Sequence, residues 1–64
     1  MTKEELKALR TSLGMSQWQF GAHLGNAIGS QCARTGVSIS EWERKGNIPE
    51  WLDANIDKIK EHKQ

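Results

Sequence analysis

The sequence has a single cysteine, Cys32, among its 64 residues, and the lack of a second one excludes a disulfide within the chain. Its two histidines do not supply the paired Cys and His spacing of a zinc finger or ribbon either. A domain of this length buries only about 60% of its unfolded surface, and its stability usually depends on a disulfide, a bound metal or self-association. We therefore expect self-association to supply the missing stability, with no metal and no cofactor.

Long apolar runs and a strong charge of either sign are also absent. No apolar stretch approaches the roughly 20 residues of a membrane span, and the opening MTKEELKALR is too charged for a signal-peptide core. We expect a cytoplasmic protein without a membrane partner. Nine Lys and Arg against eight Asp and Glu are poor evidence for nucleic-acid binding. Residues 1–46 hold six of the basic and four of the acidic side chains, so any DNA-facing patch belongs there.

What the sequence does contain is helical periodicity, without strand signals. It predicts an all-α fold, a compact bundle of four or five short helices that forms one domain over residues 1–64. The first helix begins after Thr2, which is placed to form a capping box with Glu5. This helix stops at Gly14, a residue that tolerates the left-handed conformation beyond a helix end.

The second helix begins after Ser16, which is placed to form a capping box with Gln19, and its apolar period continues to Ile28. Gly21 and Gly25 lie inside this helix, where each costs about 1 kcal/mol relative to alanine. Two such costs indicate a steric reason, such as the close approach of another helix.

The chain then breaks over residues 29–36, which we predict to be a loop that can hold one helical turn. A third helix is expected over about residues 36–45. Thr35 and Ser38 are the alternatives for its N-cap, and Gly46 ends it.

The fourth helix opens at the segment NIPE, with Asn47 as its N-cap and Pro49 inside its first turn, where proline is tolerated. Its apolar residues are Leu52, Ile56 and Ile59, with Trp51 beside them.

Residues 16–49 have the parts that a helix-turn-helix needs. Gly21 is the small residue where the helices cross, and Ile39 and Trp42 are the expected buried pair of the second of these helices. The segments LKALRTSLGMSQWQFGAHLG and VSISEWERKGNIP resemble the XRE or Cro/repressor-like helix-turn-helix family, also called lambda repressor-like, over roughly residues 4–49. The shared features are Leu-Gly before the second helix, Ser-Gln at its start and the ISEWERKG motif in the third.

One interval departs from the plain family pattern. Sixteen residues separate Gly25 from Trp42, more than the pattern has. Either the second helix runs on to Ile28 and the turn is residues 29–35, or a loop is inserted between the two helices. The first alternative keeps the apolar period, and we prefer it.

The resemblance and the side-chain chemistry together give candidate DNA contacts. Hydroxyls bond several base edges, valine can touch a thymine methyl, and glutamate can accept from cytosine N4. The candidates for base contact are Thr35, Val37, Ser38 and Glu41. The candidates for phosphate contact are Gln17, Arg34, Arg44, Lys45 and Asn47. The alternative for each is capping, solvent exposure or compensation of a helix dipole. A rival geometry places Gln31 and Arg34 of the long turn on the duplex.

The resemblance implies a sequence-specific transcriptional regulator, a Cro-like or autoregulatory repressor of a phage or mobile element, bound to double-stranded DNA as a homodimer. No small-molecule ligand is expected. An enzyme is not expected, because Cys32 and His23 lack an orienting acid in motif spacing. The alternative is an antitoxin-like or adaptor protein that binds another protein, which near-neutral charge and the expected exposure of Trp18 and Trp51 favour.

Overall fold

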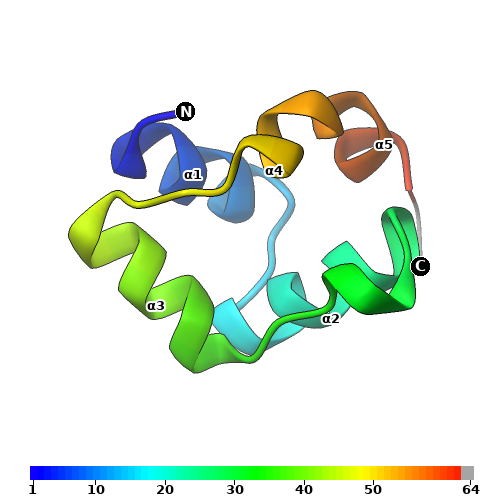
Figure 1. Cartoon of the computed structure of the whole chain (residues 1–64), viewed down its shortest axis with the longest axis horizontal. Helices are drawn as coiled ribbons and strands as arrows, with labels where there is room; N and C mark the ends of the chain where they lie inside the picture. The colour runs from blue at the N-terminus through cyan, green and yellow to red at the C-terminus, as the bar shows by residue number, and fades with distance from the viewer. Residues whose placement is uncertain (63–64) are drawn as a thin grey trace.

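Helices account for every regular element in residues 1–62, the part of the chain that the computed structural model describes (Figure 1). The α-helices are α1 (Lys3–Ser12), α2 (Gln17–Ala27), α3 (Gly36–Lys45), α4 (Glu50–Ala54) and α5 (Ile56–Glu61), and a 3-10 turn, η1 (Ser30–Cys32), separates α2 from α3. The all-α prediction is confirmed, with five α-helices in the described part. They pack into a globule of 27 × 22 × 21 Å.

The two N-terminal helices begin with the capping boxes that the sequence predicts. The Thr2 hydroxyl accepts from the backbone N–H of Glu5 at 3.1 Å, and the Glu5 carboxylate accepts from the backbone N–H of Thr2 at 2.8 Å. Ser16 and Gln19 make the same two bonds at 3.2 and 2.9 Å. The bond from the Thr2 N–H lowers the pKa of Glu5 below its ordinary value. Both helix starts are therefore fixed by local hydrogen bonds.

The two glycines inside α2 allow another part of the chain to approach closely, as predicted, but that part is not a helix. A β-carbon on Gly21 would collide with the carbonyl oxygen of Arg34, and one on Gly25 would lie 2.7 Å from the β-carbon of Ala33. The expected partner was another helix, and the structure corrects it to the chain segment just before α3. The backbone N–H of Arg34 also donates to the Gly21 carbonyl at 3.1 Å, which ties this segment to α2.

The core lies between the helices, with α3 packed against both α1 and α2. Its fully buried apolar side chains are Leu6, Phe20, Leu24, Ile39, Leu52 and Ile59. Of the buried pair expected on the third helix, Ile39 is fully buried but Trp42 is only partly so. The Trp42 ring meets the half-buried Trp51 ring edge to face, with centroids 6.1 Å apart, and the two close one side of the core.

The C-terminal region corrects the prediction of one helix capped by Asn47. Asn47 is exposed, and α4 begins only at Glu50, with Pro49 at the N-cap position. An earlier start is disfavoured because a residue that precedes proline avoids helical dihedrals. The helix breaks again at Asn55, whose side-chain amide donates to the Trp51 carbonyl at 2.6 Å. Such a local bond competes with helix continuation, so the expected fourth helix is divided into α4 and α5.

A buried histidine connects α5 to α2. His23 is fully buried, and its Nε2 donates to the backbone carbonyl of Ile59 at 2.7 Å. The ring of His62 lies edge-on to it, with a centroid distance of 5.3 Å. Because the two bonded residues are 36 positions apart, no local pattern indicates this contact.

Candidate functional site

An open groove of about 300 Å³ lies between the start of α2 and the outer face of α3. Its lining residues are Gln17, Trp18, Gly36, Val37, Ser40, Glu41 and Arg44. Four of the candidate DNA contacts meet here, and they come from both helices. These four are Gln17, Val37, Glu41 and Arg44.

The inner side of α3 is fixed behind this groove by an ion pair. The Arg10 Nε donates to Glu43 Oε2 at 2.6 Å and its Nη2 donates to Oε1 at 3.2 Å. The two side chains are only 13% and 9% exposed. The Arg10 Nη1 also donates to the Met15 carbonyl at 2.9 Å, so the guanidinium joins α1, the following loop and α3. Sequence reasoning missed this pair; the one available signal was that Glu43 follows Ile39 by four residues and so shares its inward face.

Gln17 takes part in this internal network. Its side-chain amide donates to Glu43 Oε1 at 3.4 Å, and the residue is half-buried. The Ser16 hydroxyl caps only the backbone N–H of Gln19. The first backbone N–H groups of α2 have no partner within the helix and point toward its N-terminal end. A phosphate at this position would meet backbone donors as well as the Gln17 amide.

The charges on the outer side of α3 are loosely paired. The Glu41 Oε1 lies 4.0 Å from the Arg44 Nη2 and 3.9 Å from the Lys45 Nζ. All three side chains are at least half exposed. Exposed pairs of this length contribute about 0–1 kcal/mol, so both cations can turn to a stronger anion.

The other five candidates, which include Lys45 and Arg34, do not line the groove. Thr35 is the N-cap of α3, because its hydroxyl accepts from the backbone N–H of Ser38 at 3.4 Å, and this decides between the two expected caps. Ser38 itself is half-buried, and Asn47 is exposed beyond the end of α3. The capping alternative therefore applies to Thr35.

Arg34 turns toward a different part of the molecule. Its Nη1 donates to the carbonyls of Gln31 and Ala33, at 3.0 and 2.9 Å. Its guanidinium carbon lies 5.2 Å from the centroid of the Trp51 ring, within the range of a cation–π contact. The structure thus places Arg34 beside α4 and not in the groove.

Trp18 also lines the groove, although the sequence analysis connected it only with a protein partner and not with DNA. Its expected exposure is confirmed at 63%, and Val37 beside it is 61% exposed. The pyrrole atoms of the indole lie against Gly36, where a β-carbon would collide with them. The groove therefore has an apolar end, formed by Trp18 and Val37, and a charged end, formed by Glu41 and Arg44.

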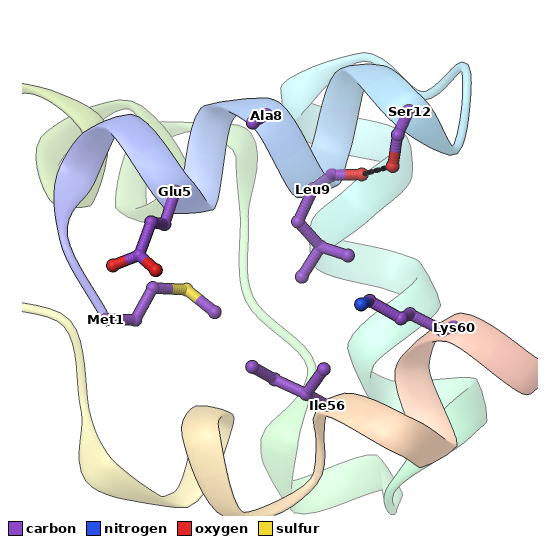
Figure 2. Close-up of a pocket in the computed structure, with 7 residues that line it drawn as sticks. All are labelled: Met1, Glu5, Ala8, Leu9, Ser12, Ile56 and Lys60. Atoms are coloured by element: carbon purple, nitrogen blue, oxygen red, sulfur yellow. Dashed lines mark hydrogen bonds between the residues drawn. The ribbon is translucent and has the colours of Figure 1, made fainter.

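A second groove, of about 340 Å³, lies between α1 and α5 (Figure 2). Met1, Leu9 and Ile56 supply its apolar lining. Figure 2 shows the Lys60 ammonium group directed toward Leu9 and Ile56, with Glu5 farther along α1. This groove brings none of the candidate contacts together.

No known protein family, curated protein or solved structure matches this chain with statistical significance. Within residues 1–62, no helix is long and apolar enough to cross a bilayer, and no three His, Cys, Asp or Glu side chains are grouped as metal ligands would be. The features of this chain that bear on its function are the groove between α2 and α3 and the sequence resemblance.

Proposed function

We propose that this chain is a sequence-specific DNA-binding regulator of transcription, in which α2, the turn with η1, and α3 form a helix-turn-helix. The observation that carries the proposal is the groove, where Gln17 of α2 meets Val37, Glu41 and Arg44 of α3. In this arrangement α3 enters the major groove while the start of α2 faces the sugar–phosphate backbone. The resemblance of two sequence segments to the XRE or Cro/repressor-like family supports the same orientation.

The side chains of α3 divide by the chemistry they offer to DNA. Val37 presents methyl groups that suit a thymine methyl, and Glu41 presents an acceptor for cytosine N4. Arg44 and Lys45 suit phosphates, as exposed cations on the last turn of the helix. Ser38 and Asn47 lie outside the groove and stay candidates for further contacts, whereas the Thr35 hydroxyl caps α3.

The proposed DNA complex is a homodimer. One recognition helix covers too few base pairs for useful specificity, and the core of this chain is small. Two copies related by a two-fold axis would read half-sites about 34–36 Å apart, one turn of the duplex. By its resemblance, such a protein regulates as a Cro-like or autoregulatory repressor of a phage or mobile element, through its own concentration.

Selection of bound duplexes from a random DNA pool tests this function. We expect enrichment of a symmetric site, and an affinity that falls linearly on a log–log plot against salt concentration, because bound phosphates release counterions. Enrichment of a single asymmetric half-site with monomeric mass would contradict the dimer. The absence of any enriched duplex at low salt would contradict DNA binding itself.

The second candidate function is an antitoxin-like or adaptor role on a protein partner. It is favoured by one observation, the exposure of Trp18 and Val37 side by side in the groove, because exposed tryptophan is enriched at protein interfaces. Salt dependence separates the two functions. The affinity of a contact dominated by apolar surface changes little between about 50 and 200 mM salt. A complex with several phosphate contacts is expected to lose roughly 10³-fold in affinity over the same range.

A further inference from the structure

The indole of Trp18 is the largest apolar side chain that residues 1–62 leave mostly exposed, and the proposed DNA contacts of α2 and α3 do not include it. It belongs to the first turn of α2, yet it packs on α3. Its atoms Cγ, Cδ1 and Nε1 lie against Gly36, the first residue of α3, and only a glycine leaves room for them. The ring is therefore held at the N-terminal end of α3, beside Val37, with much of its surface in solvent.

The position of this ring matters because a recognition helix approaches base edges with its N-terminal residues. An indole held against Gly36 lies beside Val37 and would accompany it toward the base edges. The only apolar group that base pairs display in the major groove is the C5-methyl of thymine. The exposed indole ring and Val37 together form an apolar surface against which this methyl group can be buried away from water.

The charges of the groove favour DNA over a protein as the occupant. Apolar centres of protein interfaces are depleted of glutamate, whereas Glu41 lines the same groove as Trp18. Arg44 and its neighbour Lys45 fit the phosphates that flank a major-groove contact.

We infer that Trp18 is a specificity-determining residue that reads thymine through its 5-methyl group, with Val37 as the neighbouring contact. This inference rests on the proposed function, since it requires α3 in the major groove. It assigns base reading to a residue of α2, outside the helix from which the sequence-derived base contacts come.

The test replaces each thymine of the selected duplex by deoxyuridine, which removes the methyl group and keeps the pairing and the O4 acceptor. We expect the native protein to lose about three- to fivefold in affinity at one or two positions of each half-site, as expected for one buried methyl. Trp18→Ala should lose this sensitivity at one position, Val37→Ala should lose it at the adjacent one, and Trp18→Phe should keep it.

The native protein also supports a direct version of the test, in case Trp18→Ala does not fold. The thymines at the sensitive positions are replaced by 5-iododeoxyuridine, whose iodine occupies the place of the methyl, and the complex is irradiated. We expect a cross-link on the peptide that contains Trp18.

Each contrary outcome has a separate meaning. Equal binding of thymine and deoxyuridine duplexes, unchanged methyl sensitivity in Trp18→Ala, or cross-links only elsewhere would overturn the role of Trp18 while DNA binding stands. Binding to no duplex at any salt concentration would remove the proposed function and this inference with it, and would leave the apolar end of the groove to a protein partner.

Discussion

The two sides of α3 carry similar charged groups in different environments. On the inner side, Glu43 holds Arg10 at 2.6 Å with both side chains nearly buried. On the outer side, Glu41 stands about 4 Å from Arg44 and Lys45 in solvent. Burial decides what each carboxylate does: the inner one organises the fold, and the outer one leaves its cations available for a ligand.

The energetic consequence of this difference is large. An exposed ion pair contributes about 0–1 kcal/mol, because water solvates both partners almost as well when they are apart. Removal of one partner from a buried pair costs about 3–5 kcal/mol, because the other is left desolvated and uncompensated. Substitutions on the inner side should therefore change folding, and those on the outer side should change binding.

The largest expected effect comes from breaking the buried pair. We expect Glu43→Ala to lower the free energy of unfolding by about 3–5 kcal/mol, because Arg10 stays in a partly dry site without its carboxylate. Glu41→Ala, two residues earlier on the same helix, is the matched control and should change it by less than about 1 kcal/mol. Urea unfolding followed by circular dichroism measures both. Similar losses in the two variants would contradict the distinction between the two sides.

The same comparison holds for apolar side chains of α3. Ile39→Ala should lower the free energy of unfolding by about 2–5 kcal/mol, because it leaves a cavity in the core. Val37→Ala, a β-branched residue on the exposed side, should change it by less than about 0.5 kcal/mol. Thermal melts of the two variants check this, and a large loss in Val37→Ala would place that side chain in the core.

Smaller effects, on binding alone, are expected from the outer cations. Arg44→Ala and Lys45→Ala should each weaken binding to all duplexes about equally and lower the salt slope by about one, as expected when one phosphate contact is lost. Titrations at several salt concentrations, with the unfolding curve as a control, measure this. A changed sequence preference in either variant would argue for a base contact instead.

The smallest and most local effect concerns the preferred sequence. Glu41→Ala should relax the preference at one or two operator positions, where a good base contact is worth about 1–3 kcal/mol. Arg34→Ala should leave the preferred sequence unchanged, because its guanidinium lies over Trp51. Site selection with both variants compares them. If Arg34→Ala and Gln31→Ala shift the preference while Glu41→Ala does not, the long turn and not α3 reads the bases.

Sequence reasoning did best where the physical cause is local. It predicted the starts of α1 and α2 from capping boxes that close within three residues. It predicted the end of α2 from the apolar period. It predicted the ends of α1 and α3 from Gly14 and Gly46, which have φ of 69° and 81°. It failed at the fourth helix, since the effect of Pro49 on the preceding residue outweighed the capping tendency of Asn47.

The candidate site was predictable only in part. Val37, Glu41 and Arg44 follow one another at helical spacing, so their common side of α3 can be read from the sequence. The position of Trp18 cannot, since it depends on how α2 crosses α3 and on the space that Gly36 leaves. Arg34 carries a positive charge just before α3, yet its guanidinium packs against Trp51 and does not reach the groove.

The sequence by itself determined the helical content of this protein, the caps that start α1 and α2, and the glycines that stop α1 and α3. The tertiary structure alone decided which charges are buried, which histidine meets a distant carbonyl and which aromatic ring stays in solvent. The contacts from Arg10 to Glu43 and from His23 to Ile59 span 33 and 36 positions. Partners so distant are selected by packing, because burial makes an unpaired polar group costly and only the assembled core determines which groups are buried.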